Sequence, residues 1–378
     1  MRGILLAAAV ALVLVIPGRP VHAAEAGQAG QAAQAQLAVW RPLIQKLTAD
    51  GVDKAWLERQ FSRPEAAFTT EPMVDKIQDL YHKKFGSALV RDVQHRLKAL
   101  GYLEGKADGI AGPGTRMAIR RYEHVSGLPL TGRASEALLI RLRTEKRHAP
   151  PHVALPPEPE GPPVYRTIVT PERLAEAVAF YTANLPLLRR IEAEYGVPPH
   201  VTTGLLTVET RVGLFLGEAP AFRTLASMAL CEDVSLILPS FARDNPQGPA
   251  LAWMRTKTRE KALWAYRELK ALIVYARNAG KDPLAIPGSI YGAIGIAQFM
   301  PTNALKFGVD GNRDGVVDLF TLEDALHSMG NFMKGHGWRG TAQDRALLRR
   351  VLYRYNPSVV YVNTIMHVAD HVQAQVPQ

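Results

Sequence analysis

Apolar residues recur along this chain at the spacing of a helix, and no segment of any length shows the apolar–polar alternation of a β-strand. In the segment 196–213, for example, Leu205, Val208 and Val212 fall on one helical face. Because a sheet that is exposed on one side needs strands with a two-residue period, this pattern argues against a large sheet. The sequence therefore predicts a mainly α fold, and its 378 residues suffice for about two or three domains.

A proline-rich segment divides the chain. Residues 146–163 contain seven prolines, a composition typical of an extended linker. Residues 86–145 before it have their own turns and three short stretches of helical apolar spacing, which indicates a separate small domain. We expect short helices in residues 37–85 and the main domain in residues 164–378.

The N-terminus has the features of a secretory signal. Arg2 precedes thirteen apolar residues, and small residues around Ala23 suit cleavage there, so residues 1–23 are interpreted as a signal peptide. This run is shorter than the roughly 20 residues that a membrane span needs. No later segment is apolar enough for a transmembrane anchor. We therefore expect an exported, soluble protein, periplasmic in a bacterium with two membranes.

The net charge of +10 favours polyanionic partners. Nucleic acid is a poor fit for an exported protein, whereas an anionic cell-wall matrix fits well; a basic surface without a partner is the other interpretation. The lone cysteine, Cys231, cannot form an internal disulfide and is expected to be a small buried residue.

One carboxylate stands where a core residue is expected. Glu209 follows Val208 on the apolar face of the segment 196–213. A buried carboxylate either pairs with a cation, for which Arg211 is the nearest candidate, or raises its pKa and keeps its proton. A carboxylic acid that is neutral near pH 7 can serve as a general acid. Both interpretations fit the spacing.

A second informative segment, PGSIYGAIGIAQFMPTNALKFG, spans residues 287–308 and combines glycines with polar groups such as Ser289 and Gln298. Together with the VETR sequence around Glu209, it resembles the lytic murein transglycosylases of the B type, whose catalytic domain is lysozyme-like. The resemblance covers most of residues 164–371 and, weakly, residues 37–85. Residues 86–145 resemble the small three-helix peptidoglycan-binding domain. The resemblance implies that this domain is inserted in the catalytic region, with residues 37–85 as the N-terminal part of that region.

This resemblance implies an enzyme that cleaves the MurNAc-β-1,4-GlcNAc bond of peptidoglycan and forms 1,6-anhydromuramyl ends. Glu209 would act first as the acid and then as the base, while the 2-acetamido group and the C6 hydroxyl of the substrate supply the nucleophiles. No cofactor is required for this chemistry. The substrate-binding positions implied by the resemblance are Ser289, Gln298, Asn331, Tyr355 and Asn356.

Two departures from the family pattern stand near these positions. Phe332 replaces a common tyrosine next to Asn331, and Val212 replaces a frequent tryptophan after the VETR sequence. Residues 232–260 are also longer than the connection that is usual in the family.

The segment DGNRDGVVD resembles the start of an EF-hand loop, with candidate calcium ligands Asp310, Asn312 and Asp314. The twelfth position is Thr321 rather than glutamate, and similar transglycosylases place the closing carboxylate where Asp324 stands. We expect structural Ca²⁺ here; an acidic surface turn is the alternative.

Two other functions fit parts of the sequence. A hydrolytic muramidase would use the same acid but let water attack, and a non-catalytic scaffold would use only the basic surface and residues 86–145 to bind the wall. The intact VETR and GAIGIAQFMPT segments argue against the scaffold.

Overall fold

The computed structural model describes residues 21–156, 161–340 and 344–376, with side chains from residue 31 onward. Most of the predicted signal peptide lies outside the described residues. Contacts divide the chain into two compact units, one up to Pro64 and one from Glu65 to the end. The first unit contains α1 (Val21–Ala49) and α2 (Lys54–Phe61), in which Trp40 packs on Phe61 with ring centroids 4.7 Å apart.

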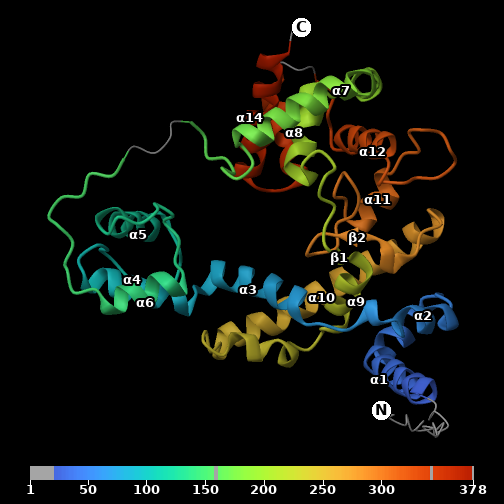
Figure 1. Ribbon diagram of the computed structural model, residues 1–378, viewed down its shortest axis with the longest axis horizontal. Coiled ribbons are helices and arrows are strands. Elements are labelled where there is room, and N and C mark those ends of the chain that lie inside the picture. The colour runs from blue at the N-terminus through green and yellow to red at the C-terminus, as the bar shows by residue number, and fades with distance from the viewer. Residues whose placement is uncertain (1–20, 157–160, 341–343, 377–378) are drawn as a thin grey trace, which may run out of the picture. The chain divides into compact units, whose positions relative to one another are not determined.

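The second unit begins with α3 (Glu71–Phe85) and continues directly into a three-helix domain (Figure 1). Its helices are α4 (Ala88–Ala99), α5 (Pro113–Val125) and α6 (Glu136–Thr144), as predicted for residues 86–145. They enclose an apolar core of their own, which includes Leu97, Ile119 and Leu142. The buried Gln94 amide donates to Asp108 and Thr115 and accepts from the Gly109 N–H group, and this network fixes the turn between α4 and α5.

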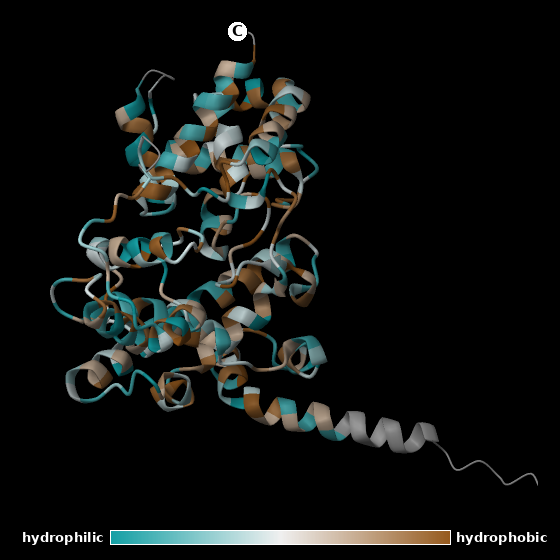
Figure 2. Cartoon of the chain, turned by 60° about the vertical axis from the view of Figure 1, so that its left-hand side comes forward, coloured by the Kyte–Doolittle hydropathy of each residue, from teal (hydrophilic) through white to brown (hydrophobic). Residues whose placement is uncertain are grey.

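The main domain is also helical, which confirms the predicted fold class. Its only paired strands within the described residues are β1 (Ala219–Pro220) and β2 (Pro287–Gly288), which run antiparallel. Figure 2 shows apolar and polar residues alternating around most helices, as expected for helices with one buried face. The helices of this domain are α7 (Pro171–Tyr195), α8 (Pro199–Thr210), α9 (Ala221–Leu230), η2 (Val234–Leu236), η3 (Leu238–Phe241), α10 (Gly248–Asn278), η4 (Pro283–Ala285), α11 (Pro301–Phe307), α12 (Leu322–Gly335), α13 (Arg345–Tyr355) and α14 (Val359–Gln375).

Most residues of helix α8 are buried. The helix packs against both α7 and α14 (Figure 1). Proline at its first position costs nothing there, because the N–H groups of a first helical turn have no partner within the helix. The helix ends at Thr210, so Val212, which the spacing places on the same face, lies in the following turn.

Among the described residues, none of the helices has the combination of length and apolar composition that is needed to cross a membrane.

Gly204 of α8 predicts an unusual response to mutation. Alanine is the better helix former by about 1 kcal/mol, but a methyl group at Gly204 would lie 2.7 Å from the carbonyl oxygen of Ile365 in α14. We expect Gly204→Ala to lower the free energy of unfolding by about 1–3 kcal/mol, as overpacking does in other cores. Calorimetry of the full chain measures this change.

The matched control is Gly114→Ala in α5, where an added carbon meets no atom within 4 Å. It should keep or raise Tm. A similar rise in both variants would contradict the close approach of α8 and α14.

Candidate active site

Glu209 lies in the last turn of α8 and is partly buried. It does not pair with Arg211, the cation considered from the sequence. Arg211 adopts a left-handed conformation with φ of 52° and ends the helix. Its guanidinium instead donates to Glu176 at 2.8 Å and to Glu172 at 2.7 Å, both on α7.

The partner of Glu209 is a tyrosine. The hydroxyl of Tyr361, a buried residue on α14, donates a hydrogen bond to Glu209 Oε1. Burial raises the pKa of Glu209 to about 7, although the hydrogen bond from Tyr361 lowers it. Among the described residues, no charged group of either sign contributes to this pKa shift. Glu209 is therefore a carboxyl group that can hold its proton near neutral pH, and desolvation is the main cause.

A second tyrosine, Tyr355, lies at the end of α13 close to the same site. Burial and the nearby charge of Glu209 raise the pKa of Tyr355 well above its usual value, and the same two effects act on the pKa of Tyr361. Both phenols therefore stay protonated and act as hydrogen-bond donors. The Tyr355 hydroxyl donates to the carbonyl oxygen of Ala297, which ties α13 to the glycine-rich loop.

The glycine-rich loop, residues 288–299, passes next to the end of α8. Thr210 donates a hydrogen bond from its hydroxyl to the Ile296 carbonyl at 3.0 Å. Gln298 has a positive φ of 46°, and its side-chain amide donates to Gly295 O at 3.0 Å and more weakly to Leu216 O at 3.5 Å. These bonds join the loop to both sides of the turn that follows Glu209.

Ser289 is turned into the loop itself. Its hydroxyl oxygen accepts hydrogen bonds from the backbone N–H groups of Ala293, at 3.0 Å, and Tyr291, at 3.4 Å. Its visible role is to shape the loop, and the hydroxyl proton remains available to a ligand.

Of the two predicted asparagines, Asn331 lies on α12 and Asn356 directly follows α13. Asn331 of α12 donates from its side chain to the Phe307 carbonyl at 3.1 Å, and Asn356 is exposed directly after α13. The neighbouring Phe332 is buried in an aromatic cluster, with its ring 4.7 Å from that of Tyr355 and 5.5 Å from that of Phe299. Phenylalanine at this position therefore serves packing.

The predicted calcium loop is folded around its own backbone. The Asp310 carboxylate accepts from Asp314 N at 3.1 Å and Gly315 N at 2.8 Å. Asn312 Oδ1 accepts from Asp314 N at 3.0 Å. Asp324 is fully buried and accepts from the backbone N–H groups of Gly311, Asn312 and Asp318.

The donor chemistry of this loop, carboxylate and amide oxygens, is that which Ca²⁺ prefers. Within the described residues, no three acidic, histidine or cysteine side chains converge on one point as a ready-made metal cage. To bind Ca²⁺, these carboxylates would have to turn from the backbone N–H groups toward the ion.

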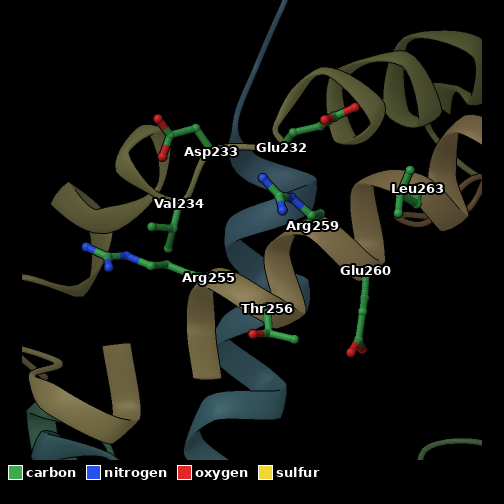
Figure 3. A pocket seen from close by; sticks show the side chains of 8 residues that line it. All are labelled: Glu232, Asp233, Val234, Arg255, Thr256, Arg259, Glu260 and Leu263. Carbon is green, nitrogen blue, oxygen red and sulfur yellow. The ribbon is translucent and has the colours of Figure 1, made fainter. Parts of the chain in front are cut away.

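A cavity of about 640 Å³ opens elsewhere in the domain. Figure 3 shows Arg255, Thr256 and Arg259 extending from α10, with Glu232 and Asp233 on the segment that follows α9. None of the predicted site residues lines this cavity.

Tyr361 is a residue of this candidate site that the sequence did not single out. A signal for it does exist, because Tyr361, Ile365 and Val368 share one buried helical face of α14. A tyrosine on such a face must find a partner for its hydroxyl. The partner, however, lies 152 residues away in the sequence.

Comparison with known families agrees with this geometry. The family model of the transglycosylase SLT domain matches residues 153–347, about half of the chain and including all of α8. The model of the peptidoglycan binding domain matches residues 86–142, which are the three-helix domain.

A curated relative is the membrane-bound lytic murein transglycosylase B of Escherichia coli K12, 30% identical over 200 residues. The match covers 52% of this chain and 48% of the relative, so the chain spans about half the length of that protein.

Two lytic transglycosylases are among the solved structures to which the chain is similar. The Escherichia coli enzyme SLT35, in complex with calcium, is 23% identical, covers 55% of this chain and 77% of its own, and has a TM-score of 0.44. SltB1 of Pseudomonas aeruginosa is 21% identical, covers 69% of this chain and 99% of its own, and has a TM-score of 0.46.

Residues on both sides of the proline-rich linker thus have family assignments that agree with their folds. The chain belongs to the transglycosylase SLT domain family and carries a peptidoglycan-binding domain between α3 and its transglycosylase domain.

Proposed function

We propose that this protein is a lytic transglycosylase that cleaves the MurNAc-β-1,4-GlcNAc bond of peptidoglycan and leaves 1,6-anhydromuramyl ends. The observation that carries the proposal is the environment of Glu209: a carboxyl group with a pKa of about 7, held by an uncharged tyrosine, whose pKa shift has no contribution from a charged group among the described residues. Glycosidases that use two carboxylates keep them within about 5–9.5 Å of each other, so their charges influence each other.

The chemistry would proceed with one carboxyl group in two roles. The protonated Glu209 gives its proton to the glycosidic oxygen as the bond to the anomeric carbon breaks. The resulting carboxylate takes the proton of the C6 hydroxyl as the oxygen of that hydroxyl closes on the same carbon. The proton given up in the first step is thus recovered in the second, and no water is consumed.

Tyr361 would position this acid. Its hydroxyl donates a hydrogen bond to Glu209 Oε1, and among the described residues no hydrogen bond is made to Oε2. The free oxygen is the one that would carry the transferred proton. Because Tyr361 stays protonated, it favours the carboxylate state after the first step.

The substrate-binding role of Ser289, Gln298, Asn331, Tyr355 and Asn356 belongs to the same proposal. Gln298 and Tyr355 are the best supported of these residues, since both contact the loop that lies against the end of α8. The three-helix domain would bind the glycan strands of the wall, which are the expected partner in place of nucleic acid. Because this proposed substrate is cell-wall peptidoglycan, the protein would act in the periplasm.

Structural Ca²⁺ in the loop of Asp310, Asn312 and Asp314, closed by Asp324, is a further part of the proposal. The ion would stabilise the loop next to α12 and take no part in bond cleavage.

Replacing the acid tests the main proposal. Glu209→Gln should keep the fold and the binding to sacculi but lose glycan cleavage by roughly 100- to 10,000-fold, because an amide cannot donate a proton as an acid does. Release of soluble muropeptides from purified sacculi is the measurement. Glu58→Gln, at an exposed position of α2, is the control and should behave as wild type. Activity of Glu209→Gln within tenfold of wild type would refute the assignment.

Tyr361→Phe should shift the pH profile. The hydrogen bond from Tyr361 lowers the pKa of Glu209, so its removal raises that pKa. Catalysis needs the protonated acid, and kcat/KM should fall as pH rises through about 7 in the wild type. In Tyr361→Phe this fall should occur at higher pH.

The control for this profile is Tyr353→Phe, because Tyr353 is 45% exposed on α13. It should leave the profile unchanged. A descending limb that stays in place or moves to lower pH in Tyr361→Phe would show that the hydroxyl does not tune the acid.

Calcium binding should appear as a gain in thermal stability. An ion that binds only the folded state stabilises it by about 2.7 kcal/mol when present at 100 times its Kd. Millimolar Ca²⁺ should raise Tm of the wild type, and Asp314→Ala should lose most of that gain. Asp53→Ala, which removes the N-cap of α2, should keep it. If Ca²⁺ shifts no melting curve, the loop is an acidic turn only.

A further inference from the structure

The segment between α9 and α10 has a structural role that the transglycosylase chemistry does not account for. The segment comprises residues 231–247 and contains only the short helices η2 and η3. Two adjacent residues of this segment, Arg243 and Asp244, contact the peptidoglycan-binding domain and the helix that leads into it.

Asp244 joins α3 to α4. Its Oδ1 accepts the backbone N–H of Ala88, the first residue of α4, at 2.7 Å, and its Oδ2 lies 2.7 Å from Nε2 of His82 on α3. The Asp244 side chain is only 8% exposed. A carboxylate at a helix N-terminus is stabilised by the unpaired N–H groups and by the helix dipole. Asp244 is therefore built into the junction where the small domain begins.

Arg243 contacts two helices of the small domain, α4 and α6. Its Nη2 donates to Asp92 of α4 at 2.9 Å, and its Nη1 donates to Glu136, the first residue of α6. Arg243 is 41% exposed, so each ion pair contributes less than about 1 kcal/mol. The two ion pairs matter more for the orientation of the small domain than for stability, because one guanidinium contacts two of its helices at once.

An aromatic cluster anchors the end of α3 beside these contacts. Tyr81 packs against Phe241 of η3 with ring centroids 5.7 Å apart, and Phe85 packs against Trp253 of α10 at 5.3 Å. Gly86 follows at once with φ of 77°, and a Cβ atom there would lie 2.4 Å from the Asp108 carbonyl oxygen. The chain thus passes from an anchored helix into the small domain without a flexible connection.

From these contacts we infer that residues 231–247 form a clamp that holds the peptidoglycan-binding domain in one orientation on the transglycosylase domain. The small domain would then not move as a freely tethered module. A glycan strand bound by the small domain would be presented to the transglycosylase domain in a defined direction. The clamp itself does not depend on the chemistry of Glu209.

Distances between spin labels test the clamp in the full chain. Labels attached through Glu104→Cys in the small domain and Arg277→Cys on α10 occupy exposed positions. The native Cys231 is fully buried, and burial raises the pKa of its thiol to about 12, so it will not react. We expect one narrow distance in this parent protein and loss of that narrow distance after Arg243→Ala with Asp244→Ala.

The matched control is Arg255→Ala with Asp233→Ala. It removes one positive and one negative charge close by in sequence, and among the described residues neither side chain bonds to the small domain. It should keep the narrow distance. Arg243→Ala alone removes only a half-exposed side chain and should broaden the distribution in a protein whose Tm is unchanged. A broad distribution in the parent, an unchanged one in the clamp variants, or equal broadening in the control would each overturn the inference.

Discussion

Glu209 is held in a partly buried position next to a neutral hydrogen-bond donor, Tyr361. Helices α7 and α14 and the glycine-rich loop pack around the helix that carries it. An ionised carboxyl group in such a place is unfavourable by about 1.4 kcal/mol for each unit by which its pKa is raised. The pKa of Glu209 is about 7 in the folded protein, against 4.5 in an ordinary glutamate. The contribution of protonated Glu209 to the free energy of unfolding is therefore fully present below pH 4.5 and is lost as pH rises through 7. Residual exposure of Glu209 makes the effect smaller than full burial would. The packing of α8 between α7 and α14 offsets this cost.

The backbone around the acid is conformationally unusual. Arg211, Val212 and Gln298 all have φ near +50°, a region that residues other than glycine rarely occupy, and valine is β-branched. Such conformations persist only where the surroundings fix them. Here the Arg211 ion pairs to α7 and the Thr210 bond to the glycine-rich loop supply that support. The same bonds keep the glycine-rich loop next to α8.

Sequence periodicity predicts the helices and the helix face on which Glu209 lies, because a helix face depends only on residues close in sequence. Partners that come from distant segments could not be predicted in this way. Tyr361 reaches Glu209 only because α14 crosses α8, and Arg211 turns to α7 because the helix ends one residue before it. The hydroxyl of Ser289 is engaged by its own loop, a detail that depends on a turn and not on residue type. The contacts of Arg243 with α4 and α6 depend in the same way on how the small domain folds back.

The mass of the products from a sacculus digest tests the central claim most directly. A single carboxyl group that serves as acid and then as base predicts 1,6-anhydromuramyl ends, which are lighter by one water than reducing ends, and predicts that no heavy oxygen enters the product when the digest is run in labelled water. Reducing ends that carry the label would contradict the account, because they would show that water attacks and that Glu209 works with a hydrolytic mechanism.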